Sequence, residues 1–289
     1  MRENVRKLLY MDKRIVYLLM ALAIAIPMFM PLGLPVRIPK SAQDFYDEIE
    51  KLNERDIVWI AAEINPANQA EFEPAIKAIF RHCLSKNLRI AVAAFYPQGA
   101  NLAATWSADL VAEFGAVYGV DYINLGPRPS TSQDSIMDNA RRDIIDAYSD
   151  RDNYGNPLSS YQIMADLQKA SDVSLAVIFT QGSPGCAEYI ANWQSTGDLM
   201  HMITVAAAVQ IPVENPRYQA GMLQGMLGGM TGGAAYEKLI GHLGSATKGL
   251  DSQGLGHLLI VVLLIVGNAC YFILKNLDEK AKTEAGGRS

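Results

Sequence analysis

Apolar residues gather along the chain in two ways: two long uncharged runs lie near its ends, and several short runs lie between them. The long runs cover 15–36 and 255–274, and each has about 20 residues, the length that crosses a bilayer core of about 30 Å. Between them, short continuous apolar runs alternate with segments in which apolar and charged residues recur at helical spacing. The pattern predicts an α/β domain inserted between two transmembrane helices.

The short apolar runs predict about five buried strands, at 57–64, 88–96, 120–126, 173–179 and 202–209. Helices are expected over 69–86, 100–118, 131–147 and 161–170, and from near Cys186 onward. Continuous apolar strands that alternate with amphipathic helices indicate a parallel sheet covered on both faces. Right-handed crossovers then favour a doubly wound, Rossmann-like fold.

A row of glycines recurs at four-residue spacing late in the central segment, and two more widen it: Gly221, Gly225, Gly228, Gly229, Gly232 and Gly233. This spacing predicts one face of a helix over 217–243, with Met222 and Met226 in a second row. Each helical glycine costs about 1 kcal/mol relative to alanine, so close approach of another backbone is expected to offset them. Packing against the domain's own sheet is one interpretation. Pairing with another copy or another membrane protein, as in a glycine zipper, is the favoured one.

The charge distribution predicts the orientation in the membrane. Lysines and arginines gather in 1–14 and 275–289, whereas the segment between the runs is acidic. Basic flanks favour the cytoplasm, so both termini are predicted inside and the domain, 37–243, outside, followed by a flexible or interfacial connector over 244–254. A cleaved signal peptide is the alternative for 15–36, but its prolines and the missing cleavage site favour an uncleaved anchor. The predicted partner is the lipid bilayer of a plasma membrane, and the acidic domain argues against nucleic acid.

Polar, turn-forming residues follow the predicted strands, where open parallel sheets bind ligands. They are Glu63, Asn65, Tyr96, Gln98, Gly99, Arg128, Ser130, Gln181, Gly182 and Ser183. Together they could line a small-molecule site, with Arg128 as the charge partner of an anion held at the start of a helix. The alternative is that these residues are present only because every strand-to-helix loop needs a turn.

Motifs of the common enzyme classes are missing. No G-x-G-x-x-G follows the first predicted strand, so no dinucleotide cofactor is expected, and there is neither a P-loop nor a G-x-S-x-G elbow. The histidines are scattered without metal-ligand spacing. Cys83 and Cys186 are expected to be buried thiols, although a disulfide stays open. We therefore expect no enzyme, no cofactor and no metal site.

The runs GMLQGMLGGMTGGAAYEKLIG and KRIVYLLMALAIAIPMFMPLGLPV, with the turns FYPQGA and QGSPG, resemble a family of uncharacterised prokaryotic membrane proteins. In that family two spans flank an α/β domain, and a Gly-rich helix ends in a similar AAYE. The resemblance covers most of the chain. It implies the same topology and supplies no activity or catalytic residue.

The leading hypothesis is a non-enzymatic, membrane-anchored structural or interaction protein. It would form a homo-oligomer or join a larger membrane complex through the Gly-rich helix. The alternative is a ligand-binding sensor or solute-binding module that uses the loops at the carboxyl ends of the strands. A hydrolase or transferase is disfavoured because the sequence pairs no nucleophile with a base.

Overall fold

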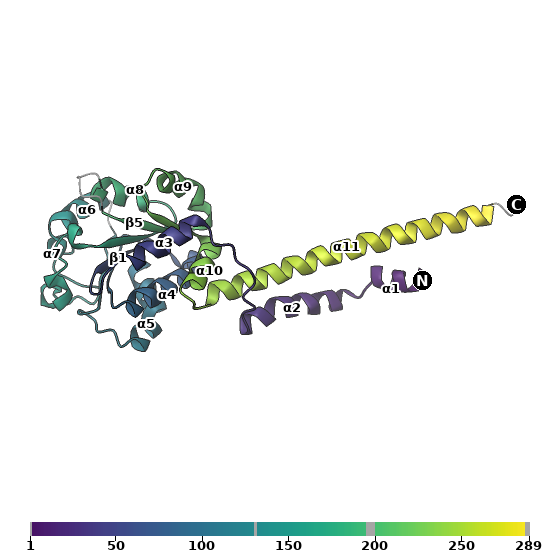
Figure 1. Cartoon of the computed structure of the whole chain (residues 1–289), viewed down its shortest axis with the longest axis horizontal. Helices are drawn as coiled ribbons and strands as arrows, with labels where there is room; N and C mark the ends of the chain where they lie inside the picture. The colour runs from purple at the N-terminus through teal and green to yellow at the C-terminus, as the bar shows by residue number, and fades with distance from the viewer. Residues whose placement is uncertain (1, 130–131, 195–199, 287–289) are drawn as a thin grey trace. The chain divides into compact units, whose positions relative to one another are not determined.

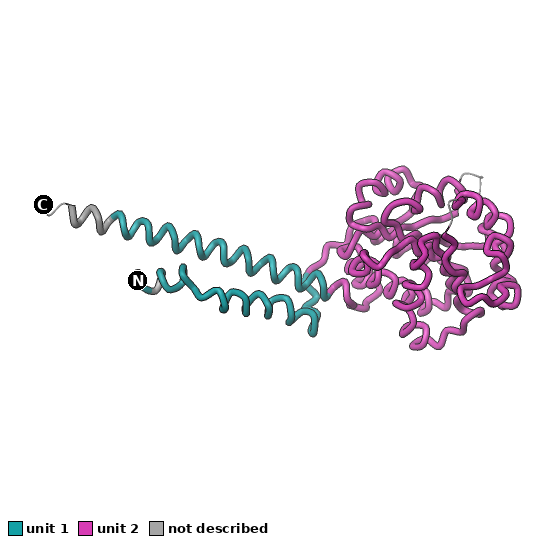
Figure 2. The backbone as a smooth tube through the Cα atoms, turned by 180° about the vertical axis from the view of Figure 1, so that it is seen from behind, with its two compact units in different colours: residues 1–34, 248–289 teal, residues 35–247 magenta. Residues whose placement is uncertain are grey.

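The computed structural model describes residues 2–129, 132–194 and 200–286 of the chain. By its internal contacts the chain divides into two units, coloured separately in Figure 2. One is an α/β domain, Pro35–Thr247, and the other is a helical unit made of Met1–Leu34 and Lys248–Ser289. The predicted α/β class is therefore confirmed for the segment between the two long apolar runs.

The described residues of the domain form one sheet of six strands, all parallel, in the order β3-β2-β1-β4-β5-β6. The strands are β1 (Ile57–Ala62), β2 (Arg89–Ala94), β3 (Tyr122–Pro127), β4 (Leu175–Thr180), β5 (Met202–Ala206) and β6 (Gly225–Gly228). The first five lie within the predicted runs or overlap them, and the sixth was not expected. This order, with crossovers on both faces, is that of doubly wound sheets.

Alternate side chains of each strand enter two separate apolar cores. On β1, Val58 and Ile60 belong to one core, and Ile57 and Trp59 belong to the other. The first core is covered by α3 (Lys40–Glu50), α4 (Gln69–Ser85), α5 (Gly99–Glu113) and α10 (Gly229–Leu239). The second is covered by α6 (Gln133–Arg142), α7 (Ile144–Ala147), α8 (Cys186–Tyr189) and α9 (Ile211–Gln219), as the ribbon in Figure 1 shows. Helices on both faces explain why the central strands are wholly buried.

Short helical turns complete the domain. They are η1 (Pro66–Asn68), η2 (Leu158–Ser160), η3 (Gln162–Ala165), η4 (Ala170–Asp172), the π-helix η5 (Ile190–Gln194) and η6 (Ala208–Gln210). The helix predicted over 161–170 is therefore wrong. The N–H groups of Gln168 and Lys169 donate to the Asp172 carboxylate, each at 3.0 Å, instead of to helical carbonyls. Side-chain acceptors of this kind compete with a helix.

The glycine-rich segment does not form the single helix predicted over 217–243. α9 ends at Gln219, residues 225–228 form the edge strand β6, and α10 starts at Gly229. Gly221 and Gly229 have φ values of 74° and 54°, so the chain turns before and after β6. The row Gly221, Gly225, Gly228, Gly229, Gly232 and Gly233 therefore shares no single helix face, although Gly229, Gly232 and Gly233 lie together in α10. Of the second row, Met222 is exposed and Met226 is buried.

These glycines let segments of the domain pack closely against one another. A Cβ added at Gly225 would lie 2.4 Å from the Cα atom of Phe45 in α3. One added at Gly232 would lie 2.9 Å from the carbonyl carbon of Leu227. Packing within the domain, the first of the two interpretations of the row, therefore accounts for these positions. Four-residue spacing misleads here because a turn, a short strand and a second turn reproduce it.

A buried imidazole links three helices of the first core. His82 Nδ1, in α4, lies 2.6 Å from the Tyr236 hydroxyl of α10, and Nε2 lies 2.8 Å from the Glu50 carboxylate of α3. Burial lowers the pKa of His82, so the ring is neutral at pH 7. Cys83 and Cys186 are buried free thiols, as expected.

The helical unit contains α1 (Arg2–Leu9), α2 (Lys13–Phe29) and most of α11 (Ser245–Gly286). Of the helices that the structure describes, α11 alone is long and apolar enough to cross a membrane, over Ser245–Glu279. The first predicted span, 15–36, is helical only as far as Phe29. A second span is therefore not established by the helix lengths.

Two carboxylates explain why α11 begins early and how the chain leaves α2. Within the domain, Glu237 accepts hydrogen bonds from the N–H groups of Gly244, Ala246 and Thr247 at 2.9–3.0 Å, so 244–254 is helical from Ser245 and not a flexible connector. Within the helical unit, Asp251 accepts from the N–H groups of residues 32, 33 and 34 at 2.7, 2.9 and 3.1 Å. The segment after α2 is thereby bound to α11.

Gly225→Ala is expected to destabilise the domain, because its methyl group would meet the backbone of Phe45. Overpacking of this kind costs about 1–3 kcal/mol or more. Thermal unfolding of the purified full-length protein in detergent measures the loss. Gly182→Ala is the matched control, since a Cβ there meets no atom of the described residues within 4 Å. Unchanged stability together with a smaller particle mass would instead favour an assembly role for Gly225.

Candidate functional site

The strand order reverses between β1 and β4, which are neighbours in the sheet although β1 is followed by β2 and β4 by β5. In doubly wound sheets this switch point, beyond the carboxyl ends of the strands, is where ligands bind. Three loops follow the central strands there: 63–65 after β1, 95–98 after β2 and 181–185 after β4. We call these loops the carboxyl-edge site, and most of the predicted ligand-binding residues belong to it.

Glu63 is fully buried and joins the loops after β1 and β2. Its carboxylate accepts hydrogen bonds from the N–H groups of Phe95 and Tyr96 at 3.0–3.2 Å, and from the Tyr189 hydroxyl of α8 at 3.2 Å. Burial raises the pKa of Glu63 to about 7, against the lowering effect of these hydrogen bonds. Glu63 therefore holds the loops after β1 and β2 together through buried hydrogen bonds.

The loops after β2 and β4 are in contact. The Tyr96 hydroxyl donates to the Ser183 carbonyl at 3.4 Å. The Ser183 hydroxyl in turn donates to Glu188 at 2.6 Å, and the second oxygen of Glu188 accepts from the Gly185 N–H at 2.8 Å. Glu188 thus caps the start of α8, and its contact with Ser183 is part of that cap. This contact provides no imidazole base for a serine nucleophile.

Two glycines hold the loops tightly against the strand ends. A Cβ at Gly99 would lie 1.9 Å from the carbonyl oxygen of Ala62, so α5 can start there only without a side chain. A Cβ at Gly185 would lie 2.3 Å from the Thr180 hydroxyl oxygen. Gly182, between them in the site, has open space around it in the described structure. Two of the three glycines are therefore required by packing.

Gln181 is the unusual residue of the site. Both polar atoms of its carboxamide are shielded from solvent, and neither has a hydrogen-bond partner among the residues that the structure describes. The backbone carbonyl of Gln181, by contrast, accepts a hydrogen bond from the side-chain amide of Gln210 at 3.2 Å. Buried polar groups are nearly always paired, and leaving one unpaired costs about 1–3 kcal/mol. The Gln181 carboxamide is thus a polar group at the switch point that the surrounding described residues leave unpaired.

Other predicted residues do not join this centre. The Arg128 guanidinium donates to the carbonyls of Pro127, Tyr148 and Arg151 at 2.8–3.0 Å and lies over the Tyr148 ring. Ser130 lies outside the described residues. The amide oxygen of Asn65 accepts from the Ala67 N–H at 2.9 Å, which is a turn-forming role.

Gln98 is exposed at the start of α5, where its backbone carbonyl accepts from the Leu102 N–H at 2.9 Å. Tyr189 and Glu188 are not among the predicted site residues. Their position in the first turn of the helix after the β4 loop could have indicated that they belong to the site. No group of His, Cys, Asp and Glu in the described part of the chain could hold a metal ion.

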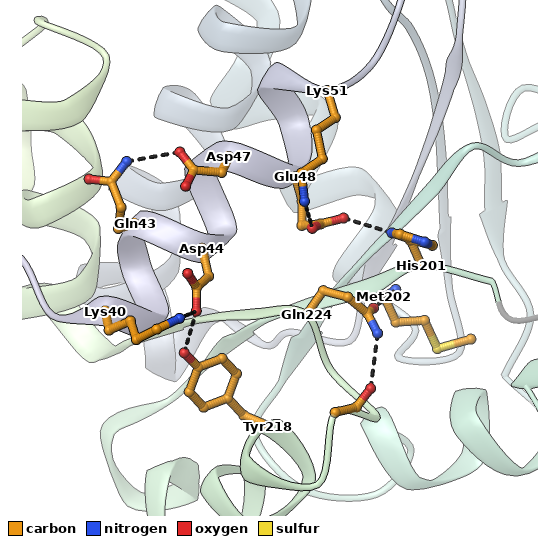
Figure 3. Close-up of polar contacts among 11 residues, drawn as sticks. Lys40, Gln43, Asp44, Asp47, Glu48, Lys51, His201, Met202, Tyr218 and Gln224 are labelled. Atoms are coloured by element: carbon orange, nitrogen blue, oxygen red, sulfur yellow. Dashed lines mark hydrogen bonds and ion pairs between the residues drawn. The ribbon is translucent and has the colours of Figure 1, made fainter.

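A hollow lies elsewhere in the domain, between α3 and the chain that leads into β6. It is a groove of about 490 Å³ lined by Lys40, Asp44, Asp47, Glu48, Lys51, Tyr218, Gln219, Gly221, Leu223 and Gln224. Figure 3 shows Glu48, which is nearly buried, between Lys51 and His201 at 2.5 and 2.7 Å. Its carboxylate is therefore already neutralised by protein groups.

Two further polar side chains of this groove, Asp44 and Gln224, are paired in a similar way. Asp44 accepts from Lys40 at 2.6 Å and from the Tyr218 hydroxyl at 2.5 Å. Gln224 accepts from the Met202 N–H at 2.7 Å, which places the start of β6 beside β5 (Figure 3). Since these contacts join α3 to the edge of the sheet, the groove is explained by the fold, whereas Gln181 is not.

Glu63→Gln is expected to flatten part of the pH dependence of stability. The pKa of Glu63 is about 7 in the folded protein and 4.5 in the unfolded chain, so the folded form binds the proton more tightly. Stability contributed by Glu63 is therefore present at low pH and is lost as the pH rises from about 4.5 through 7, by about 3 kcal/mol. Urea unfolding of the wild type and the variant between pH 5 and 8 isolates this term. A stability difference that stays constant over that range contradicts it.

Comparisons with known proteins supply no relative from which a function could be transferred. The chain has no significant match among protein-family models, curated proteins or solved structures. The resemblance to two-span prokaryotic membrane proteins accordingly stays a prediction, and the carboxyl-edge site is judged by its own geometry.

Proposed function

We propose that this chain is a membrane-anchored ligand-binding protein, a sensor or solute-binding module without catalytic activity. The observation that carries the proposal is the shielded, unpaired carboxamide of Gln181 beside the switch point of a doubly wound sheet. Switch points are the usual ligand sites of this architecture. Because both atoms are shielded in the free protein, binding requires the loop 181–185 to move and open them to the ligand. A group that then pairs with both polar atoms of Gln181 would remove an existing penalty, and that gain favours binding.

The surrounding groups restrict the chemistry of the ligand. A carboxamide offers one donor face and one acceptor face, so it matches a group with the reverse pair, such as an amide, a carboxylic acid or a nucleobase edge. An anion would meet Glu188, while Arg128, the predicted charge partner, is already bonded to carbonyls. A neutral or cationic polar molecule therefore suits the site better than a phosphate-bearing cofactor.

The other hypothesis, a scaffold that assembles through a Gly-rich helix, loses its main support because the glycine segment does not form one helix. Gly225 and Gly232 contact their own domain closely, so their cost is offset inside the fold. Ligand binding thus replaces assembly through these glycines as the better-supported function.

The proposed anchor is the helical unit. α11 is nearly all exposed apolar surface over its central part, as expected for a helix in lipid. We propose α2 as a second span, because its 17 residues give about 25 Å of helix, close to the hydrocarbon thickness. Two spans would place both basic termini in the cytoplasm and the domain outside.

Gln181→Leu is expected to keep or raise the melting temperature of the free protein, since it removes an unpaired polar group, and to abolish the thermal shift caused by a ligand. The probes are amino-acid amides, nucleobases and small carboxylic acids. A probe at 100 times its dissociation constant should raise the wild-type melting temperature by about 5–10 °C.

Gln219→Leu, the same change in the groove of Figure 3, is the matched control and should leave the shift intact. A shift that persists in Gln181→Leu and disappears in Gln219→Leu would move the site to the groove. If no probe of any of these classes shifts the wild type, the proposed ligand chemistry is wrong.

The topology is tested with reporter fusions to the full chain. Green fluorescent protein at the C-terminus should fluoresce, and alkaline phosphatase inserted beside the exposed Tyr154 should be active. A phosphatase fused before residue 13 should be inactive, because two spans return the chain to its starting side. Active phosphatase at that N-terminal position would contradict α2 as a span.

A further inference from the structure

We propose that α11 carries a dimerisation seam, centred on Asn268 and His257, which pairs with the same helix of a second copy of this chain. The inference rests on the proposed insertion of α11 into the bilayer. The proposed seam lies on the face of α11 that does not contact α2 within the helical unit.

One face of α11 is occupied within the helical unit. Ser252 donates to the carbonyl of Ile24 in α2 at 3.0 Å, and a Cβ at Gly256 would lie 3.8 Å from Met20. Cys270, further along α11, is 6% exposed. At 3.6 residues per turn, Ser252 and Cys270 lie on the same side of the helix. This side is the one that faces the N-terminal helices.

The two polar side chains of the apolar run lie on the opposite side. Asn268 and His257 are both exposed, and neither has a hydrogen-bond partner in the described structure. They are eleven residues apart, about three turns, and so differ by roughly 20° around the axis. Asn268 is roughly 160° from Cys270. Both polar groups therefore share the outward face.

Apolar residues complete this face at coiled-coil spacing. Val261 and Leu264 are 50% and 60% exposed and continue the alternating four- and three-residue steps from His257 to Asn268. A seam of this period keeps one face toward a partner helix along its length. The geometry is that of a left-handed pair of membrane helices.

The chemistry of the seam points to a second copy as the occupant. Hydrocarbon offers no hydrogen bond, so an exposed carboxamide in the span is costly until it finds a partner. Asn is both donor and acceptor, and so is neutral His. A parallel two-fold pair places each residue opposite its own copy. Two symmetric contacts, one at each depth, thus satisfy both groups, whereas a different partner would need matching polar residues at both depths.

The test uses the full-length protein in lipid nanodiscs and in native membranes. Wild type is expected to dimerise, and Asn268→Leu to weaken the dimer by roughly 3- to 30-fold, the range of interhelical polar contacts. Leucine suits the span, so the variant should still insert. Single-molecule photobleaching over a range of protein-to-lipid ratios measures the dissociation.

Cysteine cross-linking in a Cys270→Ser background locates the contact. Leu264→Cys, on the seam, should form a disulfide-linked dimer. Val262→Cys, which is 45% exposed but roughly 120° away from Asn268, should not. Monomeric wild type, a dimer unaffected by Asn268→Leu, or equal cross-linking at both positions would overturn the seam. Release of the wild type from membranes by alkaline carbonate would overturn the anchor itself, whereas a protein that stays in the membrane as a monomer would overturn only the seam.

Discussion

The close backbone contact between α3 and β6 determines much of the domain. α3 is the first helix of the domain and β6 the last strand of the sheet, and a glycine at 225 lets the two approach within van der Waals distance. α10 follows β6 directly and packs its Tyr236 ring against Phe45 of α3. The first and last elements of the domain thereby close one face of the sheet together. The imidazole of His82, between Glu50 and Tyr236, ties α4 into the same contact.

The parts of the fold that the sequence predicts are those with a continuous apolar signal. The strands β1, β2, β4 and β5 are buried along their length, so their residues could be recognised without knowing what covers them. β6 has only four residues, two of them glycine, and its strand character comes from pairing with β5 and from α3. The helix predicted over 161–170 failed for a related reason: the Asp172 carboxylate takes the N–H groups that a helix would need. In β6, contacts with segments distant in the chain decide the structure against the local sequence pattern. In 161–170, a single carboxylate does so.

The candidate site likewise has features that the sequence predicts and features that it does not. The rule that ligands bind beyond the carboxyl ends of parallel strands brought Glu63, Tyr96, Gln181 and Ser183 into one set, and the structure places them on adjoining loops. What each does depends on contacts that no spacing reveals. Glu63 turns inward to bind backbone N–H groups, Arg128 is held by carbonyls, and the Gln181 carboxamide is left without a partner among the described residues.

The contact of Gly99 with the Ala62 carbonyl has an evolutionary consequence. Any side chain at position 99 would collide with backbone, which cannot rotate away as a flexible side chain can. Selection should therefore hold this glycine fixed across lineages, whatever molecule the neighbouring loops come to recognise. Gly182, which has room for a methyl group and lies beside the site, is free to drift as specificity changes. In an alignment of homologues, an invariant residue 99 would mark a position that preserves the architecture. A variable residue 182 would mark a position at which ligand specificity diversifies.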